Sequence, residues 1–194
     1  MVTSTQFTPK KSAQYSFLII GYGNELRGDD GIGAKVAQAV ADWHLPSVKA
    51  LVTHKLVPEL ATEIVQADYV IFVDACGEES CARNVQLDPI TLGTHGTQLT
   101  SRFSHRHSSP SPLHGAAHSQ IHNVRGLLQL TEHIYGHAPQ AWLLQVPSER
   151  FTFGEQLSSI AKHGCDQALR VIERFFTNYQ VPYSVPPEPC MKSA

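Results

Sequence analysis

The chain of 194 residues is long enough for one domain with a substantial core, whereas two domains of half that length would each be unusually small. Hydrophobic residues make up 42% of the chain and charged residues 16%, as in a soluble globular protein. The formal net charge of −2 offers no general attraction for nucleic acid or for an anionic membrane, so we expect neither as a partner.

The first half of the chain alternates short apolar runs with helical patterns. Residues 1–15 are polar, contain no apolar stretch of signal-peptide length, and predict a flexible tail. Apolar runs predict strands at 16–20, 48–53 and 69–73, and apolar residues at helical spacing predict helices at about 30–43 and 58–67. This alternation predicts a parallel sheet covered by helices.

The second half begins with a long segment of weak pattern. Residues 77–123 predict a loop that holds at most a short strand at 85–87. A helix at 124–136, a strand at 141–146 and a helix from 154 or 157 into the 170s follow. Residues 181–194 are rich in proline and predict a second flexible tail, which leaves one folded domain over residues 16–180.

A glycine-rich turn follows the first strand. Residues 21–23 read Gly-Tyr-Gly before a helix, as in a dinucleotide-binding turn, but the position of the third glycine is Leu26. Asp29 and Asp30 at the start of the helix would repel a pyrophosphate group. The turn therefore suits a cation better than a nucleotide.

Three carboxylates are predicted to meet at one edge of the sheet. Asp29 and Asp30 open the first helix, and Asp74 directly follows the strand at 69–73. Acids at a helix start often only cap it, and an aspartate after a strand often begins a turn. Two adjacent acids flanked by glycines, at the edge where ligands of α/β proteins bind, exceed what a cap requires. We predict a site with Asp30 and Asp74, in which Asp29 has either role and a cation relieves the like charges.

The loop before the fourth helix is rich in histidine, namely His95, His105, His107, His114, His118 and His122. Most of these side chains are expected to be solvated, and a separate zinc site at His105 and His107 is an alternative. His122 stands out because it lies at the start of the helix, which could carry its imidazole over the sheet edge. Together with Asp30 and Asp74 it would supply an O,O,N ligand set for a divalent ion such as nickel.

These residues resemble the maturation proteases of nickel-iron hydrogenases. The first motif of that family is G-x-G-N-x-L-x-x-D-D/E-x-x-G, and residues 21–33 match it throughout. A second family feature, an apolar strand that ends in Asp-Ala, is found at residues 73–75, and the resemblance covers roughly residues 17–176. It implies a single α/β domain in which a mainly parallel, twisted sheet of about five strands is flanked by helices on both faces.

The resemblance also implies a function. It implies an endopeptidase that removes the C-terminal extension of a hydrogenase large-subunit precursor after nickel insertion. The metal-contacting positions of the family fall on Asp30, Asp74 and a histidine before the fourth helix, for which we choose His122, with His118 as the second choice. Asp30 and Asp74 would also be the catalytic carboxylates, and the nickel would be supplied by the precursor. We expect a cytoplasmic monomer whose partner is that precursor.

Two stretches narrow the resemblance, while other functions stay open. Residues 54–60 and 146–155 resemble the branch that serves bidirectional, NAD-linked hydrogenases. His54 could support the metal ligands there, although a histidine at a strand end is usually solvated. The alternatives to a protease are a non-catalytic, nickel-dependent chaperone or scaffold for the precursor and a small-molecule metallohydrolase with a resident ion.

Cysteine and serine patterns give no covalent nucleophile. No Gly-x-Ser-x-Gly elbow occurs, and no cysteine stands in a recognisable nucleophile context. The cysteines form no C-x-x-C pair and are too scattered to indicate a disulfide framework, so we expect reduced thiols at Cys76, Cys81, Cys165 and Cys190.

Overall fold

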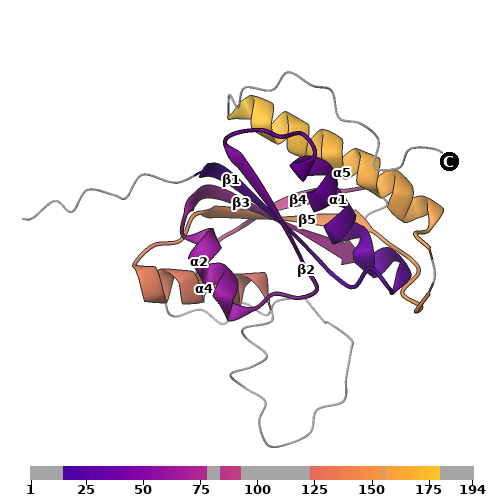
Figure 1. Cartoon of the computed structure of the whole chain (residues 1–194), viewed down its shortest axis with the longest axis horizontal. Helices are drawn as coiled ribbons and strands as arrows, with labels where there is room; N and C mark the ends of the chain where they lie inside the picture. Colours follow the sequence, from indigo (N-terminus) through magenta and orange to yellow (C-terminus); the bar gives the residue numbers. More distant parts are fainter. Residues whose placement is uncertain (1–14, 78–83, 93–122, 155, 180–194) are drawn as a thin grey trace, which may run out of the picture.

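A computed structural model describes residues 15–77, 84–92, 123–154 and 156–179. It contains one five-stranded sheet between two layers of helices (Figure 1). The strands are β1 (Tyr15–Tyr22), β2 (Val48–Thr53), β3 (Ala67–Cys76), β4 (Gln86–Ile90) and β5 (Gln140–Pro147). The helical elements are η1 (Gly28–Gly31), α1 (Ile32–Ala41), η2 (Pro58–Leu60), α2 (Ala61–Ile64), α4 (Val124–Tyr135) and α5 (Ser159–Asn178). The predicted fold class is confirmed.

The strands are ordered β2-β1-β3-β5-β4 across the sheet. All neighbours are parallel except β4, which runs antiparallel to β5. β1 and β3 lie inside the sheet, and their register pairs Ile19 with Ile71 and Gly21 with Val73. Because both strands are covered on both faces, their sequences are nearly continuous apolar runs rather than alternating ones.

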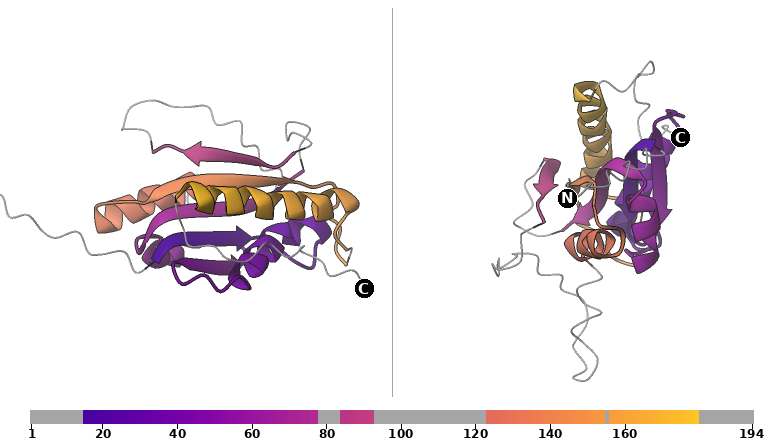
Figure 2. Two further views of the ribbon diagram at one scale, coloured as in Figure 1. Left: turned by 90° about the horizontal axis from the view of Figure 1, so that it is seen from above. Right: turned by 90° about the vertical axis from the view of Figure 1, so that its left-hand side faces the viewer.

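Alternate residues of the central strands supply two separate cores. Phe17 and Ile19 of β1 pack in the cluster under α1 and α5, whereas Leu18 and Ile20 pack in the cluster under α2 and α4. The two helix layers are seen on opposite sides of the sheet in Figure 2. The predicted acids lie beyond or near the carboxyl ends of β1 and β3, where α/β proteins usually bind their ligands.

Several predicted bounds differ from the structure. The helix predicted for 30–43 begins as the 3-10 turn η1 and becomes regular only at Ile32. The helix predicted for 58–67 is shorter, because Ala67 already belongs to β3. The short strand predicted for 85–87 is the edge strand β4, which tolerates Pro89 because proline removes a hydrogen-bond donor that an edge strand does not need on its open side.

The last helix is fixed to the sheet at its first turns. Ser158 caps α5 by accepting a hydrogen bond from the backbone N–H of Ala161 at 3.1 Å. Gly164 lets the helix approach β5 closely, since a Cβ at this position would lie 2.7 Å from a methyl carbon of Val146. α5 therefore holds Ser158 and the preceding loop firmly against the carboxyl edge of the sheet.

The cysteines correct one expectation. Cys76 and Cys165 are disulfide-bonded in the structure, so the prediction of reduced thiols is wrong for these two residues. Disulfide connectivity depends on proximity in the fold, which sequence spacing alone does not reveal.

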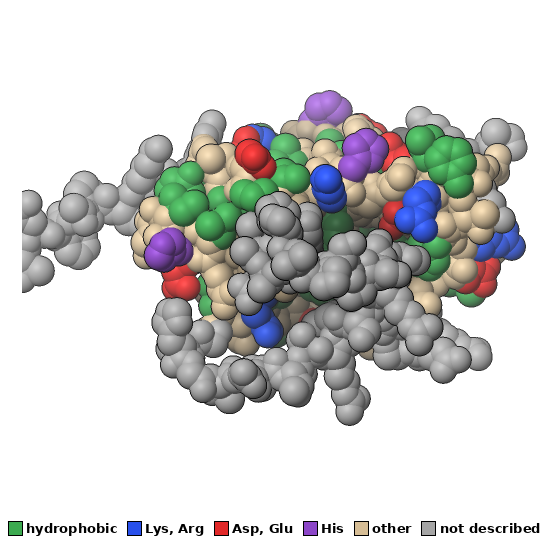
Figure 3. Space-filling model, turned by 90° about the horizontal axis from the view of Figure 1, so that it is seen from below, with side chains coloured by type: hydrophobic (Ala, Val, Ile, Leu, Met, Phe, Trp, Pro, Cys, Tyr) green, Lys and Arg blue, Asp and Glu red, His purple; other side chains and the backbone are tan. Residues whose placement is uncertain are grey.

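The described surface has no strong preference for one sign of charge. On the face shown in Figure 3, acidic and basic side chains are interspersed with hydrophobic ones. Within the described ranges, no helix combines the length and the apolar character needed to cross a membrane.

Candidate functional site

The turn after β1 is shaped by close backbone packing. Gly23 has a φ of +134°, and a Cβ there would collide with the backbone carbonyl of Asp30. Gly33, in the first turn of α1, lies so close to the sheet that a Cβ would be 2.5 Å from the carbonyl oxygens of Tyr22 and Val73. The glycines of the motif therefore bring η1 and α1 onto the ends of β1 and β3, and they do not form a phosphate cradle.

Asp29 points into the protein and is completely buried. Its Oδ2 accepts hydrogen bonds from the backbone N–H groups of Glu149 at 2.8 Å and Arg150 at 3.0 Å. Ser158 donates its backbone N–H to Oδ1 at 2.6 Å and its hydroxyl to Oδ2 at 2.7 Å. The backbone N–H of Asp29 itself donates to the carbonyl of Arg150 at 2.7 Å. Asp29 is thus a structural clamp between η1 and the loop before α5.

Hydrogen bonding keeps Asp29 ionised in spite of its burial. Burial alone would raise the pKa of the carboxyl group, but the donors of Glu149, Ser158 and Arg150 outweigh this effect and lower the pKa. A carboxylate surrounded by N–H and O–H donors is well solvated by the protein. The prediction that Asp29 shares one cleft with Asp30 and Asp74 is therefore wrong, because its charge is satisfied inside the fold.

Asp30 is half-buried and stays at the sheet edge. Its Oδ2 accepts a hydrogen bond from the backbone N–H of Asn24 at 3.1 Å, which closes the turn after β1. Oδ1 has no hydrogen-bond donor within the described part of the chain. Capping is not its role, since neither η1 nor α1 has a side-chain cap and the N-cap of α1 is Gly31.

Asp74 lies near the carboxyl end of β3, where it is half-buried. The preceding residue, Val73, pairs with Gly21, so Asp74 is adjacent to the end of β1. The phenol of Tyr22 lies beside the Asp74 carboxylate. Burial and the neighbouring negative charge of Asp74 raise the pKa of Tyr22, so the phenol is neutral. Asp30 lies in η1, which follows β1, and Asp74 lies on β3, the neighbour of β1 in the sheet.

The loop between β5 and α5 forms one wall beside these acids. Ser148 donates its backbone N–H to the carbonyl of Cys76 at 2.9 Å, and the ring of Phe151 covers Gly77. Gly154 donates to the carbonyl of Leu26 at 2.8 Å. The loop is therefore joined to β3 and to the motif turn at several points, with Asp29 at its centre.

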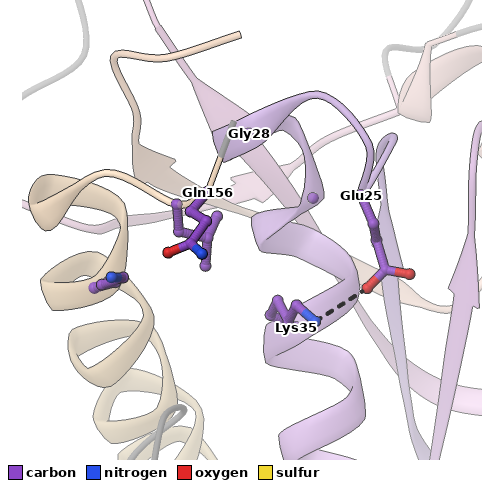
Figure 4. A pocket seen from close by; sticks show the side chains of 7 residues that line it. Glu25, Gly28, Lys35 and Gln156 are labelled. Carbon is purple, nitrogen blue, oxygen red and sulfur yellow. Dashed lines mark ion pairs between the residues drawn. The ribbon is translucent and has the colours of Figure 1, made fainter. Parts of the chain in front are cut away.

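A shallow pocket of about 270 Å³ opens beside the same turn, between η1 and the start of α5 (Figure 4). Its lining includes an ion pair of 3.5 Å between Glu25 and Lys35, whose side chains are both 47% exposed. The residues that line it are Glu25, Gly28, Gly31, Lys35, Gln156, Leu157 and Lys162. Neither Asp30 nor Asp74 contributes to it, so it is separate from the candidate site.

The predicted histidine ligand lies in a segment that the structure does not describe. His122 and its alternative His118 lie outside the described residues, as do His105 and His107. Among the described residues, no group of three His, Cys, Asp or Glu side chains could hold a metal ion. His54 follows β2 at the same sheet edge and is exposed, with no contact that links it to Asp30 or Asp74.

Tyr22 and Ser158 are the site residues that sequence reasoning missed. Tyr22 occupies the variable position of the G-x-G-N motif, where nothing in the sequence indicates a partner. Ser158 could have been found from the preference for serine directly before a helix. Its hydrogen bond to Asp29, 129 residues away, could not have been predicted from the sequence.

Comparison with known proteins gives structural neighbours only. No protein-family model matches the chain, and no curated protein matches its sequence. The [NiFe] hydrogenase maturation protease HycI of Thermococcus kodakarensis shares 21% identity, with a TM-score of 0.57 over 86% of this chain and 96% of that one. The hydrogenase maturating endopeptidase HybD of Escherichia coli shares 17% identity, with a TM-score of 0.63 over 84% of this chain and 93% of that one.

A further solved structure, the [NiFe] hydrogenase maturation protease HybD of T. kodakarensis, shares 19% identity and has a TM-score of 0.58. The match covers 82% of this chain and 98% of that one. These likenesses show that the chain has the fold of the hydrogenase maturation proteases.

The clamp gives the first testable prediction. Replacing Asp29 by Asn places an NH₂ group against backbone donors and should lower the free energy of unfolding by about 2–4 kcal/mol. The matched control is Asp30→Asn, which should cost less than about 1 kcal/mol because Asp30 accepts only the Asn24 bond. Urea denaturation followed by circular dichroism measures both. Equal stability of the two variants would contradict the structural role of Asp29.

The same clamp predicts the direction of acid denaturation. Since the pKa of Asp29 is lowered from its ordinary value of 3.8 in the folded chain, the unfolded chain binds this proton more readily. The stabilisation is therefore fully present above pH 3.8 and is lost as the pH falls below that value through the folded pKa. Unfolding curves between about pH 6 and pH 2.5 should fall more steeply for the wild type than for Asp29→Asn. Parallel curves would exclude this contribution.

Proposed function

We propose that the chain is an endopeptidase that removes the C-terminal extension of a nickel-iron hydrogenase large-subunit precursor after nickel insertion. One observation carries the proposal. Of the two adjacent acids in the motif, Asp29 is buried and hydrogen-bonded inside the fold, whereas Asp30 is half-buried in η1, which follows β1, the strand next to the one that carries Asp74. The match of residues 21–33 to the family motif and the shared fold support the same conclusion.

The chemistry of the edge suits a bound cation rather than an anion. Asp30, in η1 after β1, and Asp74, on the neighbouring strand β3, would place like charges at one edge of the sheet, and a divalent ion would relieve their repulsion. Carboxylate oxygens with one imidazole suit nickel, and we propose His122 as the source of that imidazole. The nickel is part of the substrate, since the precursor would bring it to the site. Selection of the loaded precursor then needs no separate sensor.

Hydrolysis requires an attacking water and a polarised peptide carbonyl. We propose that Asp30 or Asp74 accepts the proton of the water, while a nearby metal ion can polarise the carbonyl. A thiolate is not offered by Cys76, the cysteine next in sequence to the site, because it is disulfide-bonded in the structure. The carboxylates are therefore the groups assigned to the chemistry.

The particular precursor is proposed from the two stretches that resemble one branch of the family. Two residues of the second stretch, Glu149 and Arg150, donate the backbone hydrogen bonds that hold Asp29. We propose the large subunit of a bidirectional, NAD-linked hydrogenase as the substrate. Action as a monomer in the cytoplasm stays a prediction from the sequence.

Substitution of the acids tests the function. Asp30→Ala and Asp74→Ala should each abolish processing of a nickel-loaded precursor, because each removes a carboxylate from the sheet edge. Both should leave the fold intact, since neither residue lies in the core. Asp68→Ala is the matched control, as Asp68 lies near the opposite end of β3. Gel mobility and intact mass of the precursor measure cleavage. Full processing by either folded variant would remove that residue from the site.

The histidine ligand is tested separately. His122→Ala should impair processing far more than His105→Ala or His107→Ala, because imidazole is a good nickel ligand and alanine leaves the position to water. The same cleavage assay compares the three variants at equal protein concentration. An inactive His118→Ala beside an active His122→Ala would assign the role to His118.

A further inference from the structure

Two apolar side chains close to the candidate site are exposed. Phe153, in the loop before α5, is 72% exposed, and Leu26, in the turn after β1, is 60% exposed. Among the described residues these are the two most exposed large hydrophobic side chains. The backbone N–H of Gly154 donates to the carbonyl of Leu26 at 2.8 Å, so the two segments lie side by side although they are far apart in the sequence.

Hydrogen bonds hold both segments in place. The side-chain oxygen of Asn24 accepts a bond from the backbone N–H of Leu26 at 3.0 Å, and the backbone N–H of Asn24 donates to Asp30 at 3.1 Å. Leu26 is therefore part of the same closed turn as the candidate carboxylate Asp30. The loop that carries Phe153 is fixed by the backbone hydrogen bonds that its residues donate to Asp29.

Packing within the described part of the chain does not account for these two side chains. In the same loop as Phe153, the ring of Phe151 covers Gly77 and supplies an apolar contact with the end of β3. Leu26 and Phe153 belong to neither hydrophobic core. A single exposed apolar side chain is common, but two on adjoining, hydrogen-bonded segments next to a candidate site indicate a binding surface.

The size of this surface indicates what binds there. A stable interface between two copies of a chain buries roughly 1,200–2,000 Å², which two side chains cannot supply. They can instead anchor one apolar segment of a ligand that further contacts hold in place. A polar rim is supplied next to Leu26 by the ion pair of Glu25 and Lys35 (Figure 4). For an endopeptidase that uses Asp30, such a ligand is its protein substrate.

We therefore propose that Leu26 and Phe153 bind an apolar side chain of the precursor close to the peptide bond that is cut. The inference rests on the proposed function, since it places the precursor over the turn that holds Asp30. Neither residue takes part in proton transfer or in metal contact. The two side chains contribute to affinity and selectivity for the precursor, and the chemical step is left to the carboxylates.

The test compares wild type, Leu26→Ala and Phe153→Ala on the nickel-loaded precursor. We expect KM to rise by roughly 10-fold in each variant with kcat unchanged, because the lost contact binds substrate and transition state alike. Ile134→Ala is the matched control: Ile134 is 55% exposed near the end of α4, and the following strand β5 begins at the opposite edge of the sheet. Its KM should equal that of the wild type.

Conservative variants separate substrate binding from a change in the loops. Leu26→Met and Phe153→Leu keep an apolar side chain and should retain most of the wild-type affinity. Unchanged KM in either alanine variant, a fall in kcat alone, or equal losses in the conservative and alanine variants would overturn the inference, while wild-type cleavage upholds the proposed function.

Sedimentation of the wild type and Phe153→Ala tests the other occupant of this surface. We expect both to sediment as the same species. A wild-type dimer that Phe153→Ala dissociates would assign the surface to a second copy of the chain and overturn the inference. A wild type that leaves the loaded precursor uncut would overturn the inference together with the proposed function.

Discussion

The geometry of the sheet edge depends on one buried carboxylate. Asp29 ties η1 to the loop before α5 through four hydrogen bonds, three of them from backbone N–H groups. Without this clamp, η1 would lose its connection to the wall that Ser148 and Phe151 build on the end of β3. The next residue, Asp30, is only half-buried, and its Oδ2 accepts a hydrogen bond from the backbone N–H of Asn24.

The clamp gives two adjacent acids different roles. The charge of Asp29 is satisfied by donors inside the protein, so it adds little repulsion to the edge. Asp30 and Asp74 are half-buried, in η1 after β1 and near the carboxyl end of β3. In an α/β sheet the carboxyl ends of adjacent parallel strands are the usual ligand site, and here the register of β1 and β3 brings the acids to that place. The fold and the positions of the two acids thus both indicate the carboxyl edge of the sheet as the candidate site.

Local signals in the sequence predicted most of the architecture. The apolar runs of β1 and β3 are strong because both strands are buried on both faces, and the order of elements implied the parallel sheet. The same reasoning placed Asp30 and Asp74 at one edge. Bounds failed where a long-range contact decides them: α5 starts after Ser158, since the residues before it are held by Asp29.

Side-chain partnerships across the fold were beyond sequence reasoning. In the sequence Asp29 and Asp30 look equivalent. Only the position of Ser158 in the fold distinguishes the buried Asp29 from the half-buried Asp30. The position of Tyr22 beside Asp74 depends in the same way on strand register, which the sequence does not specify. The choice between His122 and His118 depends on one residue of alignment, and both lie outside the described ranges.

The central claim is that the sheet edge with Asp30 and Asp74 cleaves the C-terminal extension from a precursor that carries nickel. The most direct measurement is the intact mass of purified large-subunit precursor after incubation with the purified chain, with nickel-loaded and nickel-free precursor at equal concentration and free metal chelated. We predict loss of the C-terminal extension from the loaded form alone. Equal cleavage of both forms would contradict recognition through nickel, and cleavage of neither form would contradict the assignment as an endopeptidase.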